Sequence, residues 1–98
     1  MTPSLPKNPK QANILIYTKD YCPYCVAAKN LLTQRGVGFE ELDIGRDPDK
    51  AEEMLKRAQP RKTVPQIFIG EIGVGGYDDL KALDQAGKLE NLIFPAGR

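Results

Sequence analysis

The stretch Tyr21-Cys22-Pro23-Tyr24-Cys25 contains both cysteines of this 98-residue chain. It follows a short apolar run, 13–17 (NILIY), which is typical of a buried strand. It precedes a segment, 26–35, whose apolar residues have helical spacing and which is followed by a glycine, as helices often are. The two thiols therefore lie where a strand passes into a helix. Cys22 is predicted at the N-cap and Pro23 at the first helical position, which tolerates a missing N–H.

Three kinds of site use a Cys-x-x-Cys pair: a redox-active disulfide, part of a metal site, or a structural crosslink. Cys25 lies one helical turn after Cys22, close enough to form a disulfide. Free N–H groups and the dipole at the helix start stabilise a thiolate on Cys22, and Lys19 adds positive charge nearby. The thiolate is the form that attacks disulfides. Cys25, followed by apolar Val26, is expected to be more buried and to stay a thiol.

The other two interpretations need features that the sequence lacks. A protein metal site needs about four ligands, whereas this chain has two cysteines and no histidine. We therefore predict no metal-ligating residue. A crosslink with a two-residue spacer closes too small a loop to constrain the unfolded chain much. The absence of histidine also excludes Cys–His nucleophilic catalysis. A redox-active pair is favoured.

Composition predicts one small domain without a nucleic-acid or membrane surface. The formal net charge is +1 with mixed charges, and no apolar run approaches the roughly 20 residues of a membrane-spanning helix. Residues 1–12 contain three prolines and no periodicity, so we expect a flexible tail there and the folded domain over 13–98. The tail has no secretory or transit character, which leads us to expect a cytoplasmic protein. We also expect the protein to be a monomer.

Beyond the first helix, the pattern predicts alternating strands and helices. Residues 37–44 have strand character. Asp47-Pro48 is a helix-start signal, and that helix should stop at Pro60 and turn three residues inward: Met54, Leu55 and Ala58. Residues 66–76 (QIFIGEIGVGG) predict a β-hairpin.

Near the C-terminus, Asp78 is expected to cap a last helix that runs through Leu80 and closes at Gly87. A short turn at 89–94 should pack back on the core. The order is β-α-β-α-β-β-α, which predicts an α/β fold with a four-stranded mixed sheet and helices on both faces.

Three separated segments together resemble the dithiol glutaredoxins of the CPYC class. They are YTKDYCPYC (17–25), TVPQIFI (63–69) and GGYDDL (75–80), and the resemblance extends over about residues 13–94. It implies a thioredoxin fold and an enzyme that carries out glutathione-dependent thiol–disulfide exchange. Thioredoxins proper usually carry a tryptophan beside their cysteines, and this chain has none.

The resemblance also implies a role for each motif residue. Cys22 would attack and Cys25 would resolve. A cis proline at Pro65 would present the backbone of Val64 to the cysteinyl unit of glutathione, and Asp78 would face its α-amino group. The implied glutathione-binding set is Lys19, Tyr24, Thr63, Val64, Pro65, Gly76, Tyr77 and Asp78.

Most of these residues also have an ordinary structural interpretation. Lys19 could be a solvated surface charge, Gly76 a turn glycine, and Asp78 a helix cap as well as a ligand. Tyr77 stands where the family often has a smaller residue or a cysteine, which would alter the rim of the site while keeping its main-chain contact.

The predicted function is reduction of protein–glutathione mixed disulfides and protein disulfides, with glutathione as co-substrate. The expected partners are glutathione, glutathionylated or disulfide-bonded proteins and, indirectly, glutathione reductase with NADPH. Two alternatives stay open at this point. One is a dimer that shares a glutathione-ligated [2Fe–2S] cluster, and the other is a thioredoxin-like electron donor that does not depend on glutathione.

Overall fold

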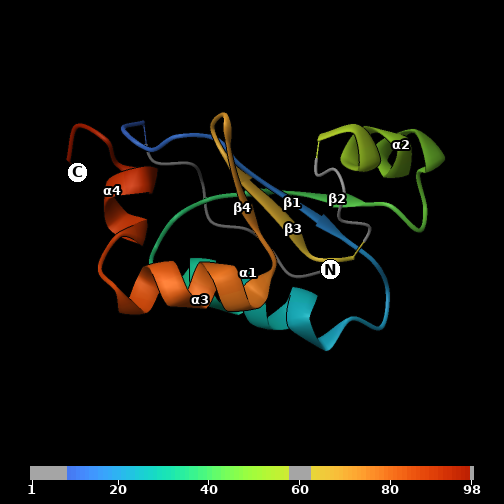
Figure 1. The fold of residues 1–98 in the computed structure, drawn as a ribbon, viewed down its shortest axis with the longest axis horizontal. Helices are drawn as coiled ribbons and strands as arrows, with labels where there is room; N and C mark the ends of the chain where they lie inside the picture. Colours follow the sequence, from blue (N-terminus) through green and yellow to red (C-terminus); the bar gives the residue numbers. More distant parts are fainter. Residues whose placement is uncertain (1–8, 58–62, 98) are drawn as a thin grey trace.

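A four-stranded mixed sheet forms the centre of the computed structural model, which describes residues 9–57 and 63–97 (Figure 1). The strand order is β2-β1-β3-β4. β1 runs parallel to β2 and antiparallel to β3, and β3 runs antiparallel to β4. The prediction of a four-stranded mixed sheet that contains a hairpin is confirmed. The strands are β1 (Ile14–Thr18), β2 (Glu40–Asp43), β3 (Gln66–Ile69) and β4 (Ile72–Gly75).

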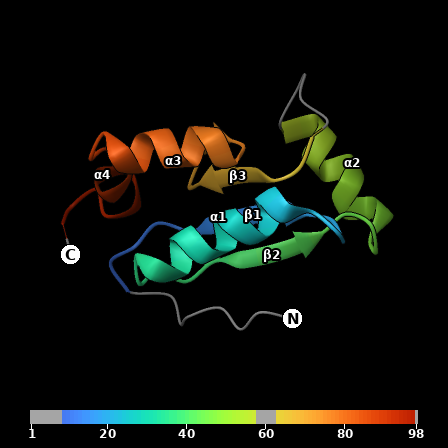
Figure 2. The same ribbon diagram turned by 90° about the horizontal axis from the view of Figure 1, so that it is seen from below.

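Helices cover both faces of the sheet, as predicted. One core joins Ile16 and Ile67 of the sheet to residues of α1, α3 and α4. A smaller core joins Tyr17 and Phe68 of the sheet to Met54 of α2. Figures 1 and 2 show α1 and α3 on one face and α2 on the other. Within the described ranges, no helix has the length and apolar character to cross a membrane. The helices are α1 (Pro23–Gln34), α2 (Pro48–Arg57), α3 (Tyr77–Gln85) and α4 (Leu89–Ile93).

In the smaller core, α2 buries fewer of its apolar side chains than the sequence predicted. Met54 is buried, but Leu55 is 39% exposed, so the prediction that it faces inward is wrong. Consecutive helical residues point about 100° apart, and α2 touches the sheet along one stripe only. Arg57 covers part of this core instead: its guanidinium lies 4.3 Å from the centre of the Phe68 ring. Ala58 and Pro60 lie outside the described residues.

The segment before β1 is attached to the domain. Gln11 is buried, and its side chain accepts the N–H of Gly38 (3.0 Å) and donates to the carbonyl of the same residue (2.8 Å). The N–H of Ala12 donates to the carbonyl of Ile93 at 2.8 Å. The packed part of the chain thus includes Gln11 and Ala12, which the sequence assigned to the tail. Residues 1–8 lie outside the described ranges.

Most helix ends follow the local signals in the sequence. Asp47 Oδ1 accepts the N–H of Asp49 at the start of α2 (3.1 Å). Gly36 and Gly87 adopt φ values of 72° and 74° after α1 and α3, the left-handed conformation that glycine adopts without a steric penalty. Their predicted positions at the helix ends are confirmed.

The start of α3 differs from the prediction. Gly76 is the N-cap, and the carboxylate of Asp79 accepts its N–H at 3.0 Å. The prediction that Asp78 caps this helix is therefore wrong. The helix begins at Tyr77, two residues earlier than a cap at Asp78 implies. The residue three positions after the N-cap is therefore Asp79, and its carboxylate can reach back to the N–H of the N-cap. Asp78 is exposed in the first turn.

An ion pair joins α1 and α3 at their far ends. The Arg35 guanidinium donates to both carboxylate oxygens of Asp84, each at 2.6 Å. These hydrogen bonds lower the pKa of Asp84 and raise that of Arg35. The contact fixes the last turns of the two helices relative to one another, while their first turns lie by the cysteines.

The capping arrangement predicts different effects for the two neighbouring aspartates. Asp79→Ala removes a cap and should lower the free energy of unfolding by about 0.5–2 kcal/mol. Asp78→Ala should change it by no more than about 0.5 kcal/mol, because the side chain is exposed. Urea denaturation of the two variants measures both values. A larger loss in Asp78→Ala would contradict the assignment of the cap.

Candidate active site

The cysteine pair lies at the start of α1, as predicted. Cys22 is the N-cap with an extended backbone (φ −113°, ψ 100°), and Pro23 is the first helical residue. The sulfur of Cys22 accepts the N–H of Cys25 at 3.1 Å. The first turn of α1 contains no acidic residue, so no carboxylate within it offsets the positive end of the helix dipole. This environment stabilises negative charge on the Cys22 sulfur.

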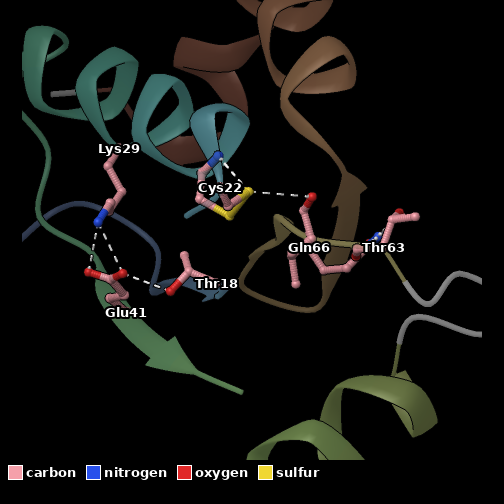
Figure 3. The surroundings of a disulfide bond; sticks show 8 residues. Thr18, Cys22, Lys29, Glu41, Thr63 and Gln66 are labelled. Carbon is pink, nitrogen blue, oxygen red and sulfur yellow. Dashed lines mark hydrogen bonds and ion pairs between the residues drawn. A yellow bond between two sulfur atoms is a disulfide. The ribbon is translucent and has the colours of Figure 1, made fainter. Parts of the chain in front are cut away.

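The two cysteines form a disulfide with a Cα–Cα distance of 5.2 Å (Figure 3). Their exposure differs: Cys25 is 2% exposed, whereas Cys22 is half-buried. A reactant can reach the Cys22 sulfur more easily than the Cys25 sulfur. The predicted difference between an accessible first cysteine and a shielded second one is confirmed.

The loop before β3 passes beside the disulfide. The Val64–Pro65 peptide bond is cis, as the family resemblance implied. The carbonyl oxygen of Val64 lies 3.8 Å from the Cys22 sulfur. Gln66, which is 2% exposed, donates from Nε2 to the carbonyl and hydroxyl oxygens of Thr63 at 2.8 and 3.3 Å (Figure 3). These bonds fix the loop that carries Val64.

Sequence reasoning did not single out Gln66. The only signal was a polar residue at the first position of an otherwise apolar strand. That signal does not distinguish a buried glutamine that binds the preceding loop, called here the Gln66 clamp on Thr63, from a glutamine exposed at a strand end.

The start of α3 lies next to the same loop. A Cβ atom on Gly76 would lie 3.6 Å from the carbonyl oxygen of Pro65, so the two backbones approach closely there. The ring of Tyr77 lies 6.3 Å from that of Tyr24, at an angle of 30°. Tyr24 is 61% exposed. The two rings therefore connect the first turn of α3 with the first turn of α1.

A cavity of about 750 Å³ lies on the other side of the cysteines, towards β2. Both cysteines and Lys19 contribute to its walls. The remaining charged residues of the wall include Arg46, which pairs with Asp20 at 3.6 Å and with Asp43 at 3.5 Å. Lys19 is exposed, and the structure gives it no ion pair with another described residue.

Two further residues of this cavity, Lys29 and Glu41, were not predicted. The Lys29 ammonium lies 3.0 and 3.2 Å from the carboxylate oxygens of Glu41, and the Thr18 hydroxyl donates to the same carboxylate at 2.7 Å (Figure 3). Two charged residues twelve positions apart form no recognisable motif, so sequence reasoning had no basis for connecting them.

Three segments far apart in the sequence thus lie close together, because 63–65 passes next to Cys22 and 76–78 lies next to Pro65 and Tyr24. They are 19–25, 63–65 and 76–78, and they contain every residue of the predicted site. Lys19 shares a cavity with the cysteines, Val64 contacts Cys22, and Tyr77 contacts Tyr24. The arrangement places an accessible sulfur at a helix start, next to a backbone carbonyl, a shielded second thiol and charged groups of both signs.

Comparison with known proteins agrees with this geometry. The family model described as Glutaredoxin matches residues 14–74. Glutaredoxin 3 of Escherichia coli strain K12 is 55% identical over 82 residues, which cover 84% of this chain and 98% of that protein.

Solved structures agree as well. The solution structure of glutaredoxin from Brucella melitensis is 43% identical, with a TM-score of 0.77, over 93% of this chain and 99% of that one. A buckwheat glutaredoxin–glutathione complex is 28% identical, with a TM-score of 0.75, over 84% of this chain and 76% of that one. The predicted thioredoxin fold is confirmed. The chain belongs to the glutaredoxin family of thiol–disulfide oxidoreductases.

Proposed function

We propose that this protein uses glutathione to reduce protein–glutathione mixed disulfides and protein disulfides. The observation that carries the proposal is the position of the Val64 carbonyl, 3.8 Å from the accessible sulfur at the start of α1. A disulfide-linked peptide at that sulfur meets a backbone carbonyl with which it can pair as a short strand does. The buckwheat structure, in which a relative is complexed with glutathione, supports glutathione as that peptide.

The charged ends of glutathione have matching groups on two sides of Cys22. Its γ-glutamyl end carries an α-carboxylate and an α-amino group. The N-terminus of α3 suits the carboxylate, because free N–H groups and the helix dipole favour an anion there. Asp78 suits the amino group, since Asp79 provides the helix cap and leaves the Asp78 carboxylate exposed. Lys19, on the cavity side, suits the glycyl carboxylate.

The remaining members of the proposed set shape the groove. The clamp between Gln66 and Thr63 holds the cis Val64–Pro65 peptide next to the sulfur. Gly76, which has no side chain, leaves its main chain open to the ligand. The rings of Tyr24 and Tyr77 flank the bound tripeptide and exclude water from one side of it.

The reaction begins from the reduced protein. The Cys22 thiolate attacks the glutathionyl sulfur of a mixed disulfide, the old S–S bond breaks, and the protein thiolate leaves with the bonding electrons and takes up a proton. A second glutathione thiolate then attacks the Cys22 adduct, which releases oxidised glutathione and restores the Cys22 thiolate. The route consumes one free glutathione, whose sulfur joins the glutathionyl sulfur of the substrate in the S–S bond of oxidised glutathione.

Protein disulfides follow a second route that uses both cysteines. Cys22 forms a mixed disulfide with the substrate, and Cys25 attacks it to give the Cys22–Cys25 disulfide. Glutathione then reduces this bond, and glutathione reductase with NADPH regenerates glutathione. The cycle depends on a compartment rich in reduced glutathione, as the cytoplasm is, and our proposal is that the protein acts there as a monomer.

The two routes predict different results for the two cysteines. Cys22→Ser should abolish both activities, because it removes the attacking thiolate. Cys25→Ser should keep deglutathionylation and lose most reduction of protein disulfides. Both are measured by NADPH consumption in a coupled glutathione reductase assay, with a glutathionylated peptide or a protein disulfide as substrate. Deglutathionylation by Cys22→Ser at the wild-type rate would refute the assignment.

The proposed contacts predict weaker use of glutathione when either charge is removed. Asp78→Asn and Lys19→Met should each raise the KM for a glutathionylated peptide roughly tenfold, the loss expected for a hydrogen bond to a charged group. Asp49→Asn and Lys81→Met are matched controls, since both residues are exposed and lie outside the proposed site. If the site variants behave like these controls, the proposed binding mode is wrong.

A further inference from the structure

We propose that the Lys29–Glu41 ion pair sets how readily the buried Cys25 ionises, and thereby the rate at which Cys25 resolves a mixed disulfide on Cys22. Lys29 and Glu41 act through Cys25 and do not touch the substrate, so they are positioning residues. The inference rests on the two-cysteine route of the proposed function.

The pair is more enclosed than the other ion pairs of the described residues that flank the cavity or lie on α2. The side chains of Lys29 and Glu41 are 12% and 27% exposed, compared with 76% and 55% for Arg46 and Asp20 and 73% and 68% for Lys56 and Glu52. Charges that are shielded from water act on their neighbours more strongly, because screening is weaker. The Thr18 hydroxyl, whose residue is buried, holds the carboxylate in place from β1.

Lys29 follows Cys25 by one helical turn. Residues four apart on a helix lie on the same face, with about 5–6 Å between their Cβ atoms. Cys25, Lys29 and Glu41 also line the same cavity, and Figure 3 shows the ion pair on the β2 side of the disulfide. The pair therefore lies beside the shielded thiol, on the side opposite Val64.

Stability alone does not explain an enclosed ion pair. Desolvation of two charges costs free energy, and apolar residues of similar volume are often as stable or more so. A pair at this position has a clear chemical effect instead. An ammonium group favours a nearby thiolate, a carboxylate disfavours it, and the two together keep the ionisation of Cys25 between these extremes.

The step that the ion pair controls is the attack of Cys25 on the mixed disulfide at Cys22. The Cys25 thiol releases its proton to water in the cavity, and the thiolate attacks the Cys22 sulfur. A Cys22–Cys25 bond forms, the bond from Cys22 to the substrate sulfur breaks, and the substrate thiolate leaves and takes up a proton. A larger thiolate fraction of Cys25 therefore speeds resolution.

Other charges around the cavity are expected to act less. They are Lys19 and Asp20 after β1, Asp43 on β2 and Arg46 after it. Arg46 pairs with both aspartates, and Lys19 is exposed. Their fields are reduced by mutual compensation and by solvent.

The test separates a charge effect from a structural one, because the two charges act in opposite directions. The enzyme is loaded with a peptide on Cys22 at acidic pH, where Cys25 stays a thiol and does not attack, and peptide release is followed by stopped flow after a jump to each higher pH. Lys29→Met should slow release about three- to tenfold near pH 7 and move the pH midpoint up. Glu41→Gln should speed release by a similar factor and move the midpoint down. The double variant should return to within about twofold of wild type.

Two comparisons complete the design. Lys56→Met and Glu52→Gln remove the charges of an exposed pair on α2 and should leave the release rate within about twofold. In a Cys25→Ser background, the Lys29 and Glu41 changes should not produce these opposite effects on deglutathionylation, because that reaction does not use the resolving step. Melting temperatures of all variants report whether each one folds.

The inference is overturned if both single changes shift the rate in the same direction, which a purely structural role predicts, or if neither shifts it more than twofold. Failure of the proposed function looks different: wild-type turnover would then not depend on glutathione at all. A glutathione-dependent wild type with same-direction variants leaves the function standing and rejects only the role of the ion pair.

Discussion

The site depends on the interaction between the Cys22 sulfur and the free N–H groups at the start of α1. Cys22 is the N-cap, its sulfur accepts the N–H of Cys25, and no carboxylate lies in the first turn. A sulfur in this position is stabilised as an anion by the free N–H groups of the first helical turn and by the positive end of the helix dipole. Proline at the first helical position removes one donor that the helix does not need, so the local sequence favours this helix start without a loss of hydrogen bonding.

Sheet topology brings the other parts of the site to that helix start. β1 and β3 are antiparallel, and Tyr17 at the end of β1 pairs with Gln66 at the start of β3. The loop after β1, which carries the cysteines, therefore lies at the same edge of the sheet as the loop before β3, which carries Val64. The hairpin of β3 and β4 then returns the chain, so that α3 begins close to Pro65. One edge of a small sheet thus collects three motifs.

The sequence predicted those features whose signals are local. The N-cap cysteine, the proline after it, the glycines that end α1 and α3, and the hairpin all depend on residues within a few positions of one another. Leu55 was predicted wrongly because apolar character alone does not say how wide a stripe a helix buries. Asp78 was mistaken for a cap because the two adjacent aspartates are equally good candidates until the first residue of α3 is known.

Contacts between distant residues could not be read from the sequence. The bond between Gln11 and Gly38 and the clamp of Gln66 on Thr63 join polar side chains to backbone groups. Such contacts have no signature of their own. The Lys29–Glu41 pair joins a helix to a strand across the cavity, and in the sequence each looks like a solvated surface charge. Of these contacts, the Gln66–Thr63 bonds fix the loop next to Cys22, and the Lys29–Glu41 pair lines the cavity beside both cysteines.

The most direct test of the central claim is the pH dependence of iodoacetamide alkylation at Cys22, measured in the Cys25→Ser variant. If the start of α1 stabilises the thiolate, the pH at which the alkylation rate is half-maximal should lie at least about one unit below 8.5, the approximate pKa of a free cysteine. A midpoint at about 8.5 would contradict the account, because the sulfur would then gain nothing from its place on the helix.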